Sequence, residues 1–200
     1  MRKVGIMGGT FNPIHNGHLT LAKEALRQFS LDEVLFIPCG NAYMKADQKV
    51  ESGQTRAKMT ALAIQDKPYF TLSTIEVEQK GNTYTYQTLE LLKIENPDTE
   101  YYFIVGADCL FQMTQWVSPE LIFSNCRILA AIRDDKTIAD MEKEICKLKK
   151  KYDANISFLH TPRMHISSSD IRRKVTAGES IDGDVPEQVK IYIEKRGLYR

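Results

Sequence analysis

The stretch from Val4 to Leu19 constrains the fold of this chain more than any other part of its sequence. It begins with a short apolar run, residues 4–7, which predicts a buried strand. Gly8 and Gly9 follow at once, and glycine lets a backbone turn sharply and approach a ligand closely. After Gly17, apolar residues recur at helical spacing. The stretch therefore predicts a strand, a glycine loop and a helix whose positive end can hold a phosphate.

Two histidines, His15 and His18, stand at the start of this predicted helix. The loop before them has neither the G-x-x-x-x-G-K-[ST] pattern of a Walker loop nor the G-x-G-x-x-G pattern of a dinucleotide site. Imidazoles donate hydrogen bonds to phosphate oxygens and carry positive charge when protonated. Half of a metal site is the alternative, but it needs further ligands, and His160 and His165 lie far along the chain.

The rest of the chain alternates predicted strands with predicted helices. Strands are expected at residues 32–38, 69–77, 100–105, 127–132 and 156–159, and helices at 54–66, 83–95, 119–123, 137–152, 167–177 and 186–196, with a short one near 110. This alternation favours an α/β fold with a doubly wound, Rossmann-like parallel sheet and helices on both faces. We expect a single domain, residues 1–200, with a small helical part at its C-terminal end.

The composition limits the class of protein. Hydrophobic residues make up 42% and charged residues 26%, which is ordinary for a globular domain, and the net charge of +1 argues against a nucleic-acid surface. The first apolar run is too short for a secretion signal or a membrane span. No C-x-x-C pair joins the four cysteines, which are Cys39, Cys109, Cys126 and Cys146. Free thiols are typical of a reducing compartment, so a cytoplasmic protein without a membrane partner is expected.

A second anion site is predicted in the stretch from Ile166 to Arg172. Ser167 can cap a helix, and Asp170 can close a capping box with it, which is a purely structural explanation. A helix N-terminus that carries serine hydroxyls and an arginine is also suited to hold an anion. The residues alone leave both explanations open.

A third candidate is the end of a predicted strand, Val105-Gly106-Ala107-Asp108. Glycine and aspartate are common where a strand turns, so a structural explanation is available here too. Ligands of open α/β sheets bind at the carboxyl edge of the strands, where the Asp108 carboxylate could accept ribose hydroxyls. Trp116, the only tryptophan, follows in a loop-like context, and a lone tryptophan is more often part of a core.

The segment Gly8–Leu19 resembles the signature G-G-T-F-[DN]-P-[IV]-H-x-G-H-[LF] of the HIGH-type nucleotidyltransferases, and more narrowly of the bacterial nicotinate-nucleotide adenylyltransferase family. That family transfers the adenylyl group of ATP to nicotinic acid mononucleotide, with Mg²⁺ on the triphosphate. The resemblance implies four catalytic residues: His15, His18, Lys45 and Arg172. It implies an ATP site that consists of Gly8, Gly9, Thr10, Phe11, His15, Gly17, His18, Gly106, Asp108, Ile166, Ser167, Ser168 and Arg172. It implies no metal site made of protein ligands, and a homo-oligomer is left open.

The resemblance also implies an acceptor pocket. Thr83–Leu89 is similar to the family pattern [PS]-Y-T-x-[DQ]-T-L, where backbone N–H groups at a helix entry take the nicotinate carboxylate. The tryptophan that follows G-A-D in the family stacks on the pyridine ring. The implied mononucleotide-binding residues are Lys45, Tyr84, Thr85, Trp116 and Arg133.

The loop after the second predicted strand departs from the family pattern P-P-H-K. Met44 stands in the place of the histidine, so that contact with the acceptor is lost, while Lys45 matches the lysine. Asn12 replaces the commoner aspartate of the first motif. Arg56 matches an arginine of the family, and without that match we expect it in a surface salt bridge.

Three alternatives remain beside this interpretation. The first is a related adenylyltransferase whose acceptor is nicotinamide mononucleotide or phosphopantetheine. The second is a non-catalytic nucleotide-binding protein, for which Met44 is the one sequence hint. The third is an unrelated dinucleotide oxidoreductase, which the missing G-x-G-x-x-G pattern disfavours.

Overall fold

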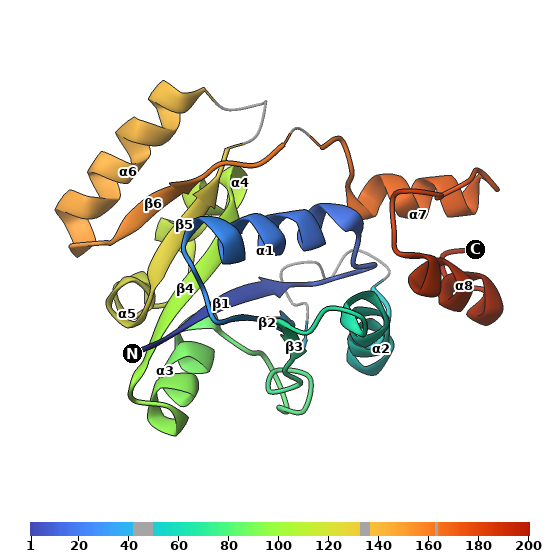
Figure 1. Cartoon of the computed structure of the whole chain (residues 1–200), viewed down its shortest axis with the longest axis horizontal. Coiled ribbons are helices and arrows are strands. Elements are labelled where there is room, and N and C mark those ends of the chain that lie inside the picture. Colours follow the sequence, from blue (N-terminus) through green and yellow to red (C-terminus); the bar gives the residue numbers. More distant parts are fainter. Residues whose placement is uncertain (42–49, 133–136, 163) are drawn as a thin grey trace.

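The computed structural model describes residues 1–41, 50–132, 137–162 and 164–200 of the chain. Its strands are β1 (Arg2–Gly9), β2 (Glu33–Pro38), β3 (Phe70–Leu72), β4 (Thr99–Gly106), β5 (Arg127–Ala131) and β6 (Ile156–Leu159). They form one parallel sheet in the order β3-β2-β1-β4-β5-β6 (Figure 1). The chain winds outward from β1 to β3, then returns to the centre and winds outward again to β6. This is the predicted doubly wound, Rossmann-like topology.

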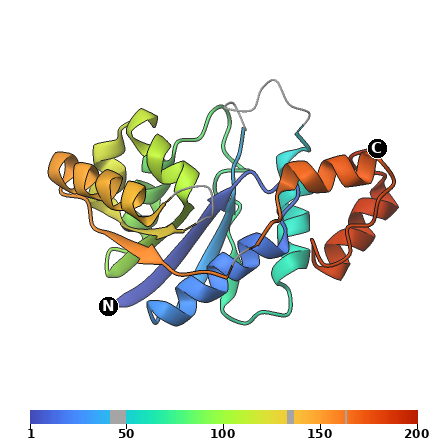
Figure 2. The same ribbon diagram turned by 90° about the horizontal axis from the view of Figure 1, so that it is seen from above.

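Helices cover both faces of the sheet. One face carries α1 (Asn16–Gln28), α2 (Gly53–Ile64), α7 (Ser168–Thr176) and α8 (Glu187–Arg196), and the other carries α3 (Thr85–Glu95), α4 (Ala107–Gln112), α5 (Pro119–Asn125) and α6 (Ile138–Tyr152). Both views place α7 and α8 at the end of the molecule opposite α6 (Figures 1 and 2). The C-terminal helical part that the sequence predicts is this pair.

Burial on both faces explains why the strands read as continuous apolar runs. In β1, Val4 and Ile6 pack into the layer beneath α3 and α4, while Met7 packs into the layer beneath α1. Successive side chains of a strand point to opposite faces, and here each face is covered by helices. Most predicted strands therefore match the observed bounds within one or two residues.

The predicted strand at residues 69–77 is wrong beyond Leu72. The backbone N–H of Ser73 still donates to Phe36 on β2, but the chain then turns. In the turn, the Glu76 carboxylate accepts hydrogen bonds from the side chains of Thr83 and Thr88. A half-buried carboxylate needs such donors, and Glu76 finds them in a turn that has already left the sheet.

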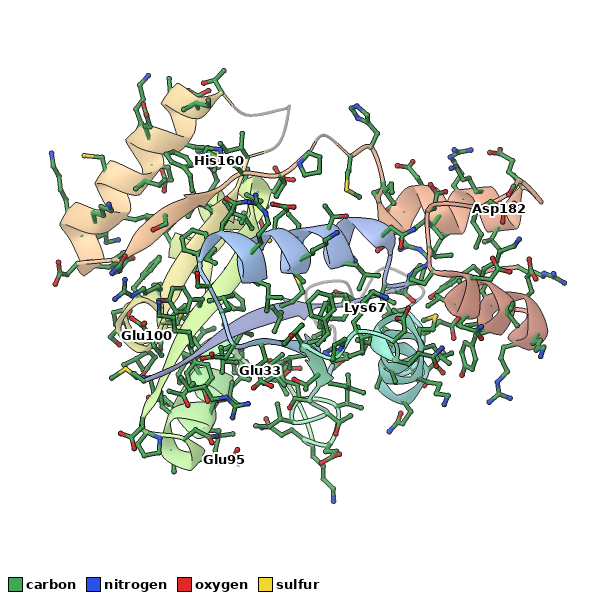
Figure 3. The ribbon with its side chains drawn as sticks, in the orientation of Figure 1. Glu33, Lys67, Glu95, Glu100, His160 and Asp182 are labelled. Atoms are coloured by element: carbon green, nitrogen blue, oxygen red, sulfur yellow. The ribbon has the colours of Figure 1, made fainter. Side chains whose placement is uncertain are left out.

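The segment between α7 and α8 is fastened to the start of α1. Asn16 donates from its backbone N–H to Asp184 and from its side-chain amide to Gly183, both at 2.8 Å. Asp182, labelled in Figure 3, pairs with Lys190 of α8. The C-terminal helices are thus attached to the helix that follows the glycine loop. Within the described ranges, no helix is both long enough and apolar enough to span a membrane.

Candidate active site

The loop between β1 and α1, residues 10–15, is a closely packed turn. Phe11 has a φ of +50°, in the left-handed region, and the Asn12–Pro13 peptide bond is cis. Phe11, Ile14 and His15 are buried. The predicted glycine loop is therefore a well-packed turn that these buried side chains anchor to the core.

His15 and His18 lie face to face, with ring centroids 3.7 Å apart and an interplanar angle of 28°. The backbone N–H of His15 donates to Nδ1 of His18 at 3.3 Å, which caps the first turn of α1. Because Nδ1 accepts this bond, a neutral His18 carries its proton on Nε2. The helix cap thus fixes the tautomer of His18, and its Nε2–H is left to donate to a ligand.

Gly17 makes this arrangement of the two rings possible. A Cβ at Gly17 would lie 2.8 Å from Nδ1 of His15, which is closer than real Cβ atoms come. Two protonated imidazoles at the observed separation would repel each other unless an anion lay against them. The geometry at the N-terminus of α1 is therefore suited to a phosphate, which the first-turn N–H groups of the helix also favour.

The second predicted motif lies directly against this loop. Ser168 donates from Oγ to the carbonyl oxygen of Pro13 at 2.9 Å, and Arg172 donates from Nη1 to that of Asn12 at the same distance. Ile166 is half-buried and packs on the core layer under α1. Two motifs about 155 residues apart thus form one continuous surface, and it carries the N-termini of α1 and α7.

The capping explanation for Ser167 is confirmed. Its Oγ accepts from the backbone N–H of Asp170 at 3.1 Å and donates to the Asp170 carboxylate at 2.7 Å. The cap leaves Ser168 and Arg172 to the neighbouring loop, so the structural and the anion-binding explanations do not compete.

The third motif follows β4, the strand beside β1. Gly106 is the N-cap of α4 and Asp108 is exposed in its first turn. The strand order reverses between β1 and β4, and open α/β sheets bind ligands outside the carboxyl ends at such a point. Asp108 is therefore on the same edge as Gly8 and Gly9.

The predicted acceptor residues belong to the elements on the other face. Trp116 is half-buried, and its ring meets Phe103 edge-on at 6.2 Å. Its indole N–H is buried and has no hydrogen-bond partner among the residues that the structure describes. Tyr84 is the N-cap of α3 and makes no side-chain cap, so the first-turn N–H groups beginning at Thr85 depend on other acceptors.

Two predicted site residues, Lys45 and Arg133, lie outside the described residues. Their sequence positions follow β2 and β5, so each comes after the carboxyl end of a strand. Their proposed contacts with phosphate stay predictions. Within the described ranges, His, Cys, Asp and Glu side chains form no group of three or more suited to a metal ion.

The prediction of a surface salt bridge for Arg56 is wrong. The side chain is 1% exposed and donates to four backbone carbonyl oxygens at 2.7–2.9 Å, those of Thr10, Cys39, Gly40 and Glu51. A guanidinium carries five N–H donors in a planar fork, and this geometry suits several carbonyls at once. Arg56 therefore joins the loop after β1 to the segments on either side of residues 42–49.

Glu76 is the functional candidate that the sequence reasoning missed. It lies in the segment that the sequence predicted as a strand. Its side chain instead accepts from Thr83 at 3.0 Å and from Thr88 at 2.8 Å, on either side of the α3 N-terminus. The alternation Ile75-Glu76-Val77-Glu78 carries no signal that separates Glu76 from the exposed Glu78.

Comparisons with known proteins agree with this geometry. A cytidylyltransferase-like family model matches residues 6–174. The probable nicotinate-nucleotide adenylyltransferase of Lachnoclostridium phytofermentans is 45% identical over 199 residues, and that of Clostridium novyi is 40% identical over 200, with 100% of both chains covered in each case. A solved structure, Plasmodium falciparum nicotinic acid mononucleotide adenylyltransferase complexed with NaAD, has a TM-score of 0.82 at 21% identity, over 100% of this chain and 98% of that chain.

The structural likeness shows the fold, and the sequence relatives show the family. The match to the relatives runs through the whole chain, and it includes the loop after β1, the entry of α3 and the start of α7. The chain therefore belongs to the cytidylyltransferase-like proteins and, among them, to the nicotinate-nucleotide adenylyltransferase family.

Proposed function

We propose that the protein transfers the adenylyl group of ATP to nicotinic acid mononucleotide, giving deamido-NAD and pyrophosphate. The observation that carries this proposal is the contact of the α7 N-terminus with the loop after β1, through Ser168 and Arg172. It creates one surface with two helix N-termini, two imidazoles and a guanidinium, which suits a polyphosphate. The full-length relatives that carry the adenylyltransferase name support the same activity.

The reaction needs no protein nucleophile. The 5′-phosphate of the acceptor attacks the α-phosphorus of ATP in line, the bond to the bridging oxygen breaks, and pyrophosphate leaves with that electron pair. The residues position both substrates and balance the charge that spreads over the phosphoryl oxygens. In this scheme His15 and His18 serve the α-phosphate, and Arg172 serves the β- and γ-phosphates.

His18 is the donor that the geometry equips best. Its Nδ1 is engaged by the backbone of His15, so the donating nitrogen is Nε2. A fixed donor costs little reorganisation when charge develops on the α-phosphoryl oxygens. His15 is 3% exposed and stacks on His18, so we assign it the task of supporting that ring as well as the phosphate.

The ATP site in this proposal comprises the residues at the carboxyl ends of β1 and β4 and at the start of α7. They are Gly8, Gly9, Thr10, Phe11, His15, Gly17, His18, Gly106, Asp108, Ile166, Ser167, Ser168 and Arg172. Asp108 would accept hydrogen bonds from the ribose hydroxyls. When bound to the triphosphate, Mg²⁺ supplies neutralisation of its charge.

The acceptor would lie at the same edge of the sheet, between the helices that cover its two faces. Backbone N–H groups of the first turn of α3, at Tyr84 and Thr85, would take the nicotinate carboxylate, since a helix N-terminus favours an anion. The ring of Trp116 would stack on the pyridine. Lys45 and Arg133 would contact the acceptor phosphate.

The test is pyrophosphate release with ATP and Mg²⁺, in parallel with nicotinic acid mononucleotide and with nicotinamide mononucleotide. A strong preference for the acid supports the proposal, because the amide lacks the charge that the α3 N-terminus favours. Equal use of the two acceptors would contradict the assigned carboxylate pocket. No release with either, in a protein that binds ATP, would favour another acceptor or a non-catalytic protein.

A further inference from the structure

Glu76 is a half-buried carboxylate that accepts hydrogen bonds from two threonines, one before α3 and one within it. Thr83 and Thr88 donate their hydroxyls to its two oxygens, and the backbone of Glu76 packs closely against Gly40. Burial raises the pKa of Glu76, while these hydrogen bonds and the nearby Arg56 oppose the shift. Because Thr83 and Thr88 flank Tyr84 and the first turn of α3, Glu76 fixes that turn from both sides.

Arg56 also contacts Gly40, through the carbonyl oxygen of that residue. Its Nη2 lies 2.8 Å from the carbonyl oxygen of Gly40 and 2.7 Å from that of Cys39, and its Nη1 lies 2.7 Å from that of Thr10. Thr10 belongs to the loop that carries the predicted ATP site. The buried side chain of Arg56 therefore fixes the distance between that loop and the residues that follow β2.

Gly40 is the link between the two charges. Its carbonyl oxygen accepts a hydrogen bond from Arg56, and its Cα lies directly against the backbone of Glu76, so both residues restrain the position of Gly40. A Cβ at this position would lie 2.2 Å from the backbone carbonyl oxygen of Glu76, so a side chain is excluded. We name Gly40, Arg56, Glu76, Thr83 and Thr88 the acceptor frame.

Removing the charge of Arg56 from water is costly, and hydrogen bonds to four carbonyl oxygens offset part of that cost. What the acceptor frame does supply is a fixed relation between Thr10 and the first turn of α3.

We propose that Glu76 and Arg56 are positioning residues that set the α3 N-terminus against the ATP loop and thereby determine selectivity for an acceptor that carries a carboxylate. The inference rests on the proposed function. A helix N-terminus discriminates an anionic acceptor from its neutral amide only if its N–H groups are held at the right distance. Neither Glu76 nor Arg56 has to touch a substrate for this.

The informative variant is Glu76→Gln. It keeps the shape of the side chain but replaces one accepting oxygen with a donating amide. That amide would face the hydroxyl of Thr83 or Thr88, which is itself the donor in the wild type. The matched control is Glu78→Gln, since Glu78 is an exposed carboxylate two positions away that accepts from Thr74. Thr88→Val removes one donor of Glu76 without altering a charge.

The experiment measures kcat and KM with nicotinic acid mononucleotide and with nicotinamide mononucleotide, together with the Kd of a non-hydrolysable ATP analogue. For Glu76→Gln we expect KM for the acid to rise about tenfold and the acid-to-amide ratio of kcat/KM to fall by a similar factor. The Kd of the ATP analogue and the Glu78→Gln control should stay within about twofold of wild type. The combined Glu76→Gln and Thr88→Val effects should be less than additive.

The outcomes separate the inference from the proposed function. An active wild type with an unchanged acid-to-amide ratio in Glu76→Gln overturns the inference and leaves the function intact. Equal losses with both acceptors mean a general structural role and also overturn it. A wild type that uses neither acceptor overturns both. If Glu76→Gln does not fold, Thr88→Val gives the decisive ratio.

Discussion

Nη1 of Arg172 donates a hydrogen bond of 2.9 Å to the carbonyl oxygen of Asn12, 160 positions earlier in the chain. A guanidinium has further N–H groups, so Arg172 can hold the loop after β1 and a phosphate at once. The three N–H donors of lysine all leave one nitrogen, so it cannot span two separated acceptors as the planar guanidinium fork does. The contact therefore links the shape of the loop after β1 to the residue that we propose binds the phosphates of ATP.

Arg172→Lys should lower kcat/KM by about 10²- to 10³-fold while the protein stays folded, because charge is kept but the fork is lost. Steady-state pyrophosphate release measures this, and circular dichroism checks the fold. Arg173→Lys is the matched control, since Arg173 is exposed and its ion pair with Glu179 lies at the surface. If Arg172→Lys kept near-wild-type rates, the proposed phosphate contact would be misassigned.

Two substitutions at His18 should separate its cap from its chemistry. Asparagine has an oxygen near the place of Nδ1 that can still accept from the backbone of His15, but it lacks the Nε2 donor. We expect His18→Asn to lose about 10²- to 10³-fold in kcat with little change in stability. His18→Ala should lose a similar rate and, in addition, about 1 kcal/mol of stability with the cap. Urea unfolding and initial rates measure both, and an active His18→Asn would refute the donor role of Nε2.

Trp116 should report acceptor binding directly, because it is the only tryptophan. Stacking of a pyridine ring on the indole should quench its fluorescence in a saturable way when nicotinic acid mononucleotide is added. Trp116→Ala should raise KM for the acceptor about tenfold, with KM for ATP little changed, and Trp116→Phe should lie between it and wild type. A defect confined to ATP would place the acceptor pocket elsewhere.

Cys126 should make the fold sensitive to alkaline pH. Burial raises the pKa of its thiol from 9.0 to about 12, and the thiol donates to Ile122 at 3.2 Å. Between these two pH values the unfolded state binds fewer protons than the folded state, so stability falls as pH rises. This one group contributes a slope of up to about 1.4 kcal/mol per pH unit.

Cys126→Ala should remove that contribution. Urea unfolding of the variant and of wild type between pH 9 and 11 measures the difference in slope. Cys146→Ala is the control, since Cys146 is exposed. Parallel pH profiles for wild type and Cys126→Ala would show that the buried thiol does not titrate as expected.

Local patterns predicted the fold well because its strands are buried on both sides. The apolar run of β1, the glycines after it and the histidines at the start of α1 are neighbours in sequence, so their structure could be read from sequence. The cap of α7 by Ser167 is equally local. Such features depend on spacing, which a sequence displays.

What the sequence did not predict depends on distant partners. Arg56 is buried because four carbonyls from three separate segments converge on it, and nothing within its own helix indicates this. Glu76 accepts hydrogen bonds from Thr83 and Thr88 in a turn beyond the end of β3. The contact of Ser168 with Pro13 likewise needs the whole fold.

The contact between α7 and the loop after β1 can form only late in the synthesis of the chain. A ribosome makes β1 among the first residues and α7 among the last, and the pieces of the sheet come between them. A nascent chain that has completed β6 can pair all its strands, yet Ser168 and Arg172 are still missing from the loop that they shape. Unfinished or C-terminally clipped chains would lack both the residues that shape this loop and the apolar side chains that α7 and α8 add to the core.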